Sequence, residues 1–509
     1  MTEGVSFFER IQGKLHPVTV KYYYGPRMLK SKESLPYLAR VLLAHVVMLV
    51  KRGIIPESAG AKLAESLLQF ALEPDKAKLA LDPGLEDLYV NLERLLTREL
   101  GAEVSGYLPV GRSRNDLEGT MWRMELREKA ARVLDSFISL VRILCRRAEE
   151  MSEAIMPGYT YGQQAQPITM GHYLSGIASA LLRDCGRMAD AVKRFDYCPL
   201  GAAAFAGTGY PIDRELTARL LGFRGVMEHS LDAVASADFM LETLSAAAMG
   251  AVTLTRFAED IMKWCSNEVG FASLPDDLID SSSIMPQKRN PVIVATVRSQ
   301  GRLVAGKVSA LYAACSVGFE ASRDVTVAWE EVLECLGIVE GMSEITSAYT
   351  GEIIFNTETM ERALSIGFSN ATEVADTLVR EGGMPFRLAH QVVGAAVADL
   401  YSRGGTPAEF TCALLDRWCR KIAGIPLPVN EAAVREALDN RVGVARRISI
   451  GGPAPSEVRR MIAAQRVAAD ELEDISTSWA ARWRDAGRQL EEEARGLIAR
   501  TVHNDSGVM

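Results

Sequence analysis

The sequence contains few of the residue patterns that build metal centres or disulfide frameworks. Its eight cysteines lie far apart without a C-x-x-C pair, and its six histidines form neither H-x-H nor H-E-x-x-H. These spacings give no indication of a metal site, so we expect no metal cofactor. Cysteines scattered without a framework are typical of a reduced, cytoplasmic chain.

Long apolar runs and an excess of basic charge are also missing. The most apolar runs, 41–50 and 243–255, stop short of the ~20 residues that a membrane span requires, and the first 14 residues carry charges where a signal peptide needs an apolar stretch. We therefore expect two buried helices, no membrane association and no export. The net charge of −8 argues against a nucleic-acid partner, and an anionic ligand would need local basic groups.

Helical periodicity dominates what is present. Apolar residues from Trp122 to Leu144 recur in steps of three, four or seven, which predicts one helix of roughly 30 residues. Further long helices are predicted over 239–264, after Pro291, and from about Ser456. Strand alternation is scarce, so the pattern indicates an all-α protein with a central long-helix bundle.

At 509 residues the chain is long enough for about three domains, which favours an enzyme or a large scaffold over a small binding module. We place the boundaries near 115 and 365. The segments are an N-terminal helical domain (1–115), the central bundle (116–365) and a C-terminal helical domain (366–509).

Three short polar stretches each precede a predicted long helix: GRSRND (111–116), GYTYGQQAQP (158–167) and SSSIMPQKRNP (281–291). Free N–H groups and the dipole of a helix N-terminus attract anions, and two of the stretches add arginine or lysine. Such stretches could hold a small polyanion. Ordinary helix capping with exposed basic residues is the alternative for any one of them.

Helix-start signals lie inside these stretches. Asp116 and Asn290 are residues suited to an N-cap. Pro167 and Pro291 suit the first helical turn, where a missing N–H costs nothing.

The third stretch is rich in hydrogen-bond donors and suits removal of a proton next to a carboxylate. Loss of that weakly acidic proton adds a second negative charge, which preorganised donors and a lysine would stabilise. A serine acts as the base only where N–H groups and cations stabilise its alkoxide. Ser282, Lys288 and Asn290 provide these residue types.

The three stretches resemble the aspartase/fumarase superfamily and, within it, argininosuccinate lyase. SSSIMPQKRNP is similar to the superfamily signature G-S-S-x-M-P-x-K-x-N-P with Ser281 at the glycine position, and GRSRND is the argininosuccinate lyase form of the first motif. Similarity continues in order through EDLYVNLERLL (86–96), PLGAAAFAGTGYPIDRE (199–215), GFSNATEVAD (367–376) and GGPAPSEVRR (451–460).

This resemblance implies a homotetramer with about twenty long helices in its core, three domains per subunit and active sites built from three subunits. It implies β-elimination from a small anionic substrate, a substituted succinate, usually with release of fumarate and with no metal or organic cofactor. The catalytic residues implied are Ser282 as base, Lys288 and Tyr161. The substrate-binding residues are Arg112, Ser113, Arg114, Asn115, Thr160, Gln163, Ser283, Met285, Asn290 and Arg323.

The chain departs from the family where the leaving group would be bound. Tyr161 and Gly162 replace the histidine motif T-H-L-Q, and a tyrosine, with a pKa near 10, is a poor substitute for histidine. Val292, Ala321 and Thr326 stand where the family has an acid, a tyrosine and a glutamine. These losses predict that argininosuccinate is a poor substrate.

Three functions stay open on the sequence. The first is a C–N lyase that releases fumarate from an N-substituted aspartate. The second is a lyase that eliminates a good leaving group such as phosphate from a sulfonated or phosphorylated acid, with Arg323 as its partner. The third is a non-catalytic structural tetramer, since this family has supplied lens crystallins.

Overall fold

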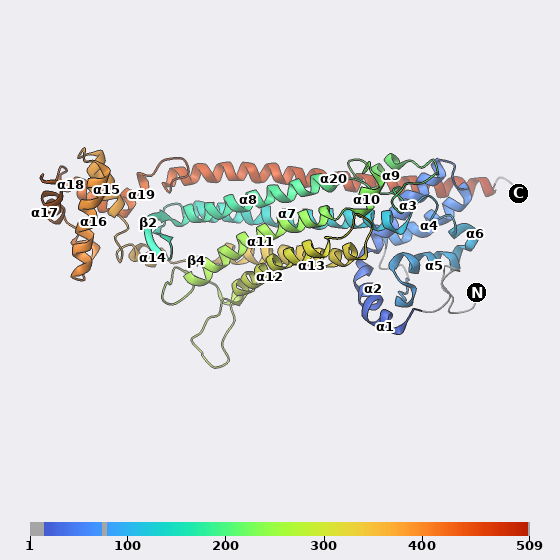
Figure 1. Ribbon diagram of the computed structural model, residues 1–509, viewed down its shortest axis with the longest axis horizontal. Coiled ribbons are helices and arrows are strands. Elements are labelled where there is room, and N and C mark those ends of the chain that lie inside the picture. Colours follow the sequence, from blue (N-terminus) through green and yellow to red (C-terminus); the bar gives the residue numbers. More distant parts are fainter. Residues whose placement is uncertain (1–14, 74–78, 507–509) are drawn as a thin grey trace.

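The computed structural model describes residues 15–73 and 79–506 and has an all-α fold, as predicted. The first 14 residues, on which the expectation about export rests, lie outside the described part. Figure 1 shows an elongated molecule in which long helices run between two groups of shorter ones. Helices that precede the bundle lie at one end, and most of those that follow it lie at the other.

Six long helices form the central part: α7 (Arg114–Glu150), α8 (Met170–Phe195), α11 (Asp238–Trp264), α12 (Val292–Ala314), α13 (Arg323–Glu352) and α20 (Pro455–Ser506). Helix α11 packs on α8, α12 and α13, while α7 packs on α8, α13 and α20. Their apolar faces share one continuous core.

Helix α7 shows how the sequence produces this packing. The predicted apolar series is buried, with Leu126, Phe137 and Leu144 fully inaccessible to solvent. At 37 residues the helix is longer than predicted, because it begins at Arg114, inside the first polar stretch. Small residues allow α11 to approach it closely: a Cβ at Gly250 would lie 2.4 Å from the ring of Phe137.

The N-terminal part has its own core around α3 (Leu35–Lys51), α4 (Glu57–Leu72), α5 (Leu88–Leu100) and α6 (Ala102–Ser105). Before them lie α1 (Pro17–Thr19), η1 (Val20–Tyr24), α2 (Gly25–Ser31) and η2 (Lys32–Ser34), and η3 (Pro83–Leu85) precedes α5. The apolar run 41–50 is buried in α3, as expected.

Within the described residues, the segment Pro17–Lys51 is long and apolar enough by composition to cross a membrane. Its most apolar window is 72% buried inside the protein. Such burial is what the core helix of a protein shows, because packed neighbours already cover its apolar surface.

Shorter elements connect the long helices and form the far end of the molecule. Strands β1 (Ile155–Thr160) and β2 (Gln163–Thr169) form an antiparallel hairpin, and β3 (Ala272–Ser273) pairs with β4 (Ile354–Phe355). The short helices are α9 (Arg214–Leu220), α10 (Ser230–Ala235), η4 (Asp276–Leu278), α14 (Thr357–Ala363), α15 (Ala371–Arg380), α16 (Phe386–Ser402), η5 (Pro407–Glu409), α17 (Cys412–Ala423), α18 (Glu431–Leu438) and α19 (Asn440–Ala445). Helices α15 to α18 enclose a separate small core.

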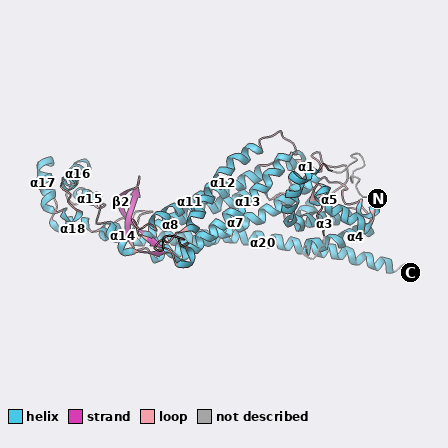
Figure 2. Cartoon of the chain, turned by 90° about the horizontal axis from the view of Figure 1, so that it is seen from below, coloured by secondary structure: helices cyan, strands magenta, loops and turns pink. Residues whose placement is uncertain are grey.

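The last helix leaves this far end and returns along the molecule. Helix α20 packs on α7 and α8 and then on α3 and α4, and Figure 2 shows it reaching the end at which the chain begins. The predicted third segment, 366–509, therefore contains a compact helical part and a helix that packs with the bundle. The division at 115 and 365 stays a prediction.

A buried charge cluster joins three distant parts of the chain. Arg127 of α7 lies 3.3 Å from Asp196, and both side chains are at most 2% exposed. Arg127 also donates to the Leu221 carbonyl at 2.7 Å, and Arg482 of α20 pairs with the other oxygen of Asp196. Burial of the carboxylate is tolerated because two guanidinium groups neutralise it.

We expect Arg127→Met to lower the free energy of unfolding by about 3 kcal/mol, because it leaves a buried carboxylate with one cation fewer. Arg132→Met is the control on the same helix. It removes an exposed pair with Glu340 and should cost less than ~1 kcal/mol. Urea unfolding at fixed protein concentration measures both, and equal losses in the two variants would contradict the role of the cluster.

Candidate active site

The first polar stretch forms the start of α7. The N-cap is Ser113 and not Asp116: the Ser113 hydroxyl accepts from the Asn115 N–H at 3.3 Å, and Asp116 accepts from the Ser113 N–H at 2.8 Å. This reciprocal pair is a capping box, in which the acid belongs three residues after the cap. The helix start thus fixes the backbone of Ser113 and Asn115.

Asp116 also holds a second segment against this helix start. Its other carboxylate oxygen accepts from the N–H groups of Gly201 and Ala203 at 2.8 and 2.9 Å, and the side chain is fully buried. Burial raises the pKa of Asp116, while the three N–H donors act in the opposite direction. Next to it, the Asn115 amide donates to the Ala204 carbonyl at 3.0 Å.

Arg114 is held by two carboxylates from the N-terminal part. One of its terminal nitrogens lies 2.8 Å from both Glu86 and Asp87. Burial acts to lower the pKa of Arg114, but the hydrogen bonds and charges of these two acids outweigh it and leave the pKa above its ordinary value. Arg114 therefore stays charged, at a helix N-terminus suited to anions.

A cavity of about 210 Å³ opens beside Arg114 and Asn115. Its lining includes Ala321, which precedes α13, and Thr326 of α13, two positions at which the chain departs from the family motif. The complete lining is Asp87, Arg114, Asn115, Glu118, Trp122, Val234, Ala321, Ser322, Val325 and Thr326. Residues 200 positions apart in the sequence thus meet in one pocket. We refer to it as the α7 pocket.

Arg112 lies inside the protein, not in this pocket. It is 9% exposed, donates through Nε to the Leu108 carbonyl at 3.1 Å and covers the ring of Tyr89 at 4.6 Å. Of the substrate-binding residues predicted in this stretch, Arg114 and Asn115 line the pocket, Ser113 caps the helix, and Arg112 supports the backbone.

The second polar stretch is a β-hairpin, and Pro167 lies in its second strand and not in a helical turn. Thr160 pairs with Gln163, and Tyr161 and Gly162 form the turn with φ of +53° and +74°. Positive φ at both central positions is typical of a tight hairpin turn. The Tyr161 side chain is fully exposed at this tip.

The third polar stretch is a loop between α11 and α12, closed at its base by a backbone bridge between Asp280 and Asn290. The Ser282 hydroxyl accepts from the N–H groups of Ile284 and Met285 at 3.5 and 3.1 Å. Asn290 does not cap α12, whose N-cap is Pro291. The side-chain amide of Asn290 instead donates to the Ser281 carbonyl at 3.4 Å.

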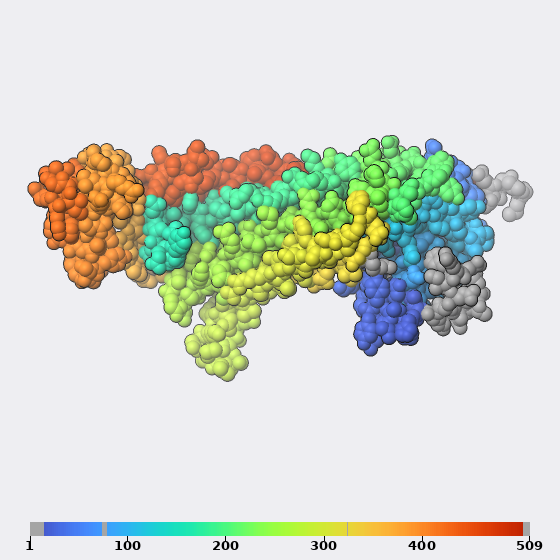
Figure 3. Space-filling model, in the orientation of Figure 1, coloured from blue at the N-terminus to red at the C-terminus, as the bar shows by residue number. Residues whose placement is uncertain are grey.

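Other predicted residues of this loop are solvent-exposed. Ser283, Met285 and Lys288 all belong to the loop, which projects from the bundle as the yellow-green lobe in Figure 3. Arg323 is the first residue of α13, and its side chain lies outside what the structure describes. In a single subunit, Ser283, Met285 and Lys288 are therefore exposed to solvent.

One subunit does not bring the three stretches together. Hairpin β1–β2 packs on α14, α19 and α8, at the end of the molecule away from α1 to α6 (Figure 1). The start of α7 lies beside the N-terminal helices, and the loop projects from the bundle. A site that uses all three stretches needs more than one copy of the chain.

Four residues that line or flank the α7 pocket had no predicted functional role: Glu86, Asp87, Glu118 and Trp122. The first two open the stretch EDLYVNLERLL, whose family similarity was visible but carried no role. Periodicity places Trp122 on the apolar face of α7. Only the tertiary structure, in which Glu86 and Asp87 pair with Arg114, shows that acids surround the pocket.

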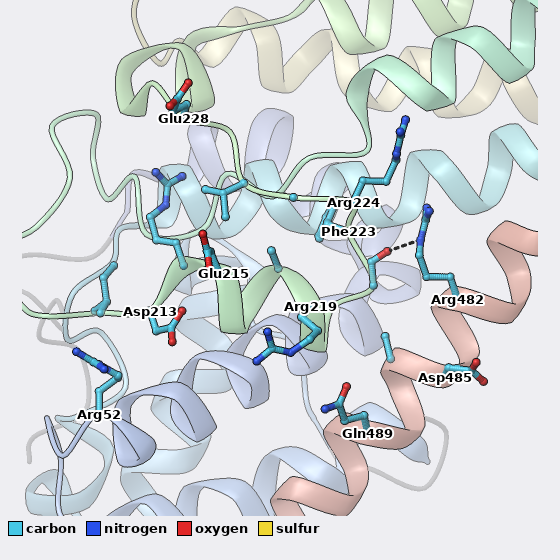
Figure 4. A pocket seen from close by; sticks show the side chains of 17 residues that line it. Arg52, Asp213, Glu215, Arg219, Phe223, Arg224, Glu228, Arg482, Asp485 and Gln489 are labelled. Carbon is cyan, nitrogen blue, oxygen red and sulfur yellow. Dashed lines mark hydrogen bonds between the residues drawn. The ribbon is translucent and has the colours of Figure 1, made fainter.

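A larger cavity lies elsewhere, between α9 and α20, and has a volume of about 1380 Å³ (Figure 4). Four of its five arginines bond to backbone carbonyls: Arg52 to Pro211, Arg214 to Leu200, Arg224 to Lys193 and Arg482 to Gly222. None of the predicted site residues lines it. Its cations therefore serve mainly to hold the segment 199–228 in place.

Comparison with known proteins shows the family to which the chain belongs. The lyase family matches residues 27–307, and the argininosuccinate lyase C-terminal family matches residues 368–445. Argininosuccinate lyase from Methanothermobacter thermautotrophicus is 36% identical over 82% of this chain and 89% of its own. The enzyme from Maricaulis maris is 37% identical over 83% and 88%. The chain belongs to this lyase family and is an enzyme of the aspartase/fumarase superfamily, similar to argininosuccinate lyase.

Solved structures give the same fold. EDDS lyase in complex with formate superimposes with a TM-score of 0.85 at 27% identity, over 97% of this chain and 98% of that one. A variant of EDDS lyase with bound fumarate has the same TM-score. At 19% identity, the 3-carboxy-cis,cis-muconate lactonizing enzyme from Pseudomonas putida still has a TM-score of 0.68, which shows the shared fold.

We expect Asp116→Asn to lower the free energy of unfolding by about 2 kcal/mol. The amide cannot accept all three backbone N–H groups, and one buried donor then faces an NH₂ group. Asp190→Asn, an exposed acid on α8, is the control and should change stability by less than ~0.5 kcal/mol. Urea unfolding compares the two, and an unchanged midpoint for Asp116→Asn would contradict the anchoring role.

Proposed function

We propose that the protein is a C–N lyase that releases fumarate from an N-substituted aspartate. The α7 pocket carries this proposal, because it combines groups for both halves of such a substrate. Arg114, Asn115 and the N-terminus of α7 suit a carboxylate, whereas Asp87 and Glu118 suit the amine. Lyases of the matched family provide the chemical precedent.

Ser282 is proposed as the base. It would remove a proton from the carbon next to one carboxylate, the electron pair would form the C=C bond, and the C–N bond would break with its electrons on nitrogen. Two backbone N–H groups already point at the Ser282 hydroxyl oxygen, which supports a serine alkoxide. Lys288 and Asn290 would hold the carboxylate that gains charge.

The remaining predicted residues are proposed to bind the succinyl part or its surroundings. Thr160 and Gln163 at the hairpin tip, with Ser283 and Met285 of the loop, would close around the carboxylates. Tyr161 would donate a hydrogen bond to the departing nitrogen. Ser113 and Arg112 would act through the backbone of the first stretch, and Arg323 would add a cation at the start of α13. No step of this scheme requires a metal or an organic cofactor.

A homotetramer is proposed as the functional form, with each site built from three subunits. The separation of the hairpin, the loop and the α7 pocket supports this arrangement. So does the apolar surface of the bundle, where Met249, Val252, Leu303 and Tyr312 are each about half exposed. A second copy would bury these side chains and form the long-helix core.

The two alternative functions have less support. Elimination of phosphate or another anion would place negative charge beside Asp87 and Glu118, which is unfavourable. A purely structural tetramer does not explain why a polar, exposed loop preserves Ser282, Lys288 and Asn290. The eight cysteines are all free, which fits the proposed cytoplasmic location.

Turnover of N-substituted aspartates, followed by the ultraviolet absorbance of fumarate, tests the proposal. We expect Ser282→Ala to lower kcat at least about 100-fold, as deletion of a positioned proton-transfer group does. Lys288→Met should also reduce kcat, because it removes the cation that stabilises the dianion. Glu320→Gln, near the start of α13 but outside the proposed machinery, is the control. Near-normal turnover by Ser282→Ala would remove this serine from the mechanism.

Sedimentation tests the assembly. We expect a single species of four chains, because the half-exposed apolar faces of α11 and α12 favour association. Leu303→Glu should shift the distribution toward smaller species, since it places a charge in the proposed core. A stable 55.6 kDa species of the unmodified chain would contradict the proposed site.

A further inference from the structure

A second cavity adjoins the α7 pocket and has no role in the chemistry described so far. It has a volume of about 440 Å³ and lies between α2, the start of α5, α7 and α13. Asp87, Glu118 and Trp122 line both cavities. A group that leaves the α7 pocket on this side therefore meets the second cavity, which we refer to as the tail cavity.

The floor of the tail cavity is apolar and aromatic. Trp122 and Trp329 stack with ring centroids 5.6 Å apart and an interplanar angle of 25°. Other buried apolar residues of the lining are Met28, Leu38, Leu88, Leu117 and Met121. Such a surface favours a ligand with an apolar, and especially an aromatic, body.

The charged groups around this floor are mainly acidic. Seven carboxylates line the tail cavity, at Glu33, Glu86, Asp87, Glu118, Glu125, Glu330 and Glu334, against three cations, at Arg27, Lys30 and Lys129. Even after Arg114 is counted as the partner of Glu86 and Asp87, and Lys307 as the partner of Glu334, negative charge is in excess. A cationic ligand is favoured here and a carboxylate is disfavoured.

One of these acids lies deep in the wall. Glu125 is 3% exposed and accepts a hydrogen bond from Ser34 at 2.9 Å. Burial raises the pKa of this carboxyl group. A cation placed in the cavity would favour its ionised form, and the indole faces of the two tryptophans would attract the same cation.

We infer that the tail cavity receives the leaving amine, and that this amine has an apolar body and a second cationic group but no carboxylate. The inference rests on the proposed C–N lyase function. Diamines with an aromatic or alkyl body belong to this class, whereas arginine, which carries a carboxylate, does not. In the elimination the amine leaves with the C–N electron pair and gains a proton; in the reverse direction its lone pair adds to fumarate.

Amine addition to fumarate by the full-length protein tests this inference. Four amines form the panel: methylamine, benzylamine, 4-(aminomethyl)benzylamine and 4-(aminomethyl)benzoate. We expect kcat/KM for the diamine to exceed that for benzylamine by about 10-fold and that for the benzoate by about 100-fold. Argininosuccinate, assayed in the elimination direction, should be cleaved poorly.

Variants that fill the cavity give a second readout. Gly337 lines the tail cavity, and a Cβ there has no atom within 4 Å. Gly337→Phe should raise the KM for the diamine and lower its kcat/KM relative to methylamine about 10-fold. Gly341→Phe is the matched control, since it lies one turn further along α13, is equally open and is not part of the lining.

Sedimentation of both glycine variants shows whether assembly is preserved. If Gly337→Phe changes it, Ser31→Phe on the α2 wall provides the same test. The outcomes separate the two proposals. If no amine reacts and no N-substituted aspartate is cleaved, the C–N lyase function fails. If amines react but the benzoate or methylamine is preferred, or filling leaves the diamine-to-methylamine ratio unchanged, the tail cavity does not receive the amine.

Discussion

Burial of α11 is the constraint on which the rest of the molecule depends. Thirteen consecutive residues of this helix, 243–255, carry no charge. Its small residues let neighbouring helices approach so closely that a Cβ at Gly250 would lie 2.4 Å from the ring of Phe137. Helices α8, α12 and α13 pack along it, α7 approaches it at Gly250, and α20 packs on α7 and α8. Part of its surface, at Met249 and Val252, stays half exposed in one subunit.

This packing decides where chemistry can occur. The long helices pack through their apolar faces, and every proposed catalytic residue lies in a turn or loop that connects helices or strands. Asp116 shows how firmly an end can be fixed, because one buried carboxylate accepts three backbone N–H groups from two segments. The loop that carries Ser282 has its described polar contacts within 274–292, so its position relative to the other motifs depends on assembly.

Prediction from the sequence was accurate for features that depend only on residues close together in the chain. The apolar series of α7 specified a buried helix, although its start at Arg114 depended on which of Ser113 and Asp116 acts as the cap. Predictions were wrong where the same residue suits two different local structures. Pro167 fits a helical first turn as well as a strand, and the pairing of Thr160 with Gln163 selected the strand. Arg112 fits an exposed binding loop, yet stacking on Tyr89 placed it inside.

The sequence by itself determined the all-α class, the long helices and the three polar stretches, because these follow from residue types a few positions apart. Only the tertiary structure showed that Asp87 and Glu118 face Ala321 and Thr326 across one cavity, or that Trp122 stacks on Trp329 beside it. These residues lie about 200 positions apart in the sequence. No local pattern relates them, since their proximity results from the packing of α13 on α7 and from the ion pairs that join Arg114 to Glu86 and Asp87.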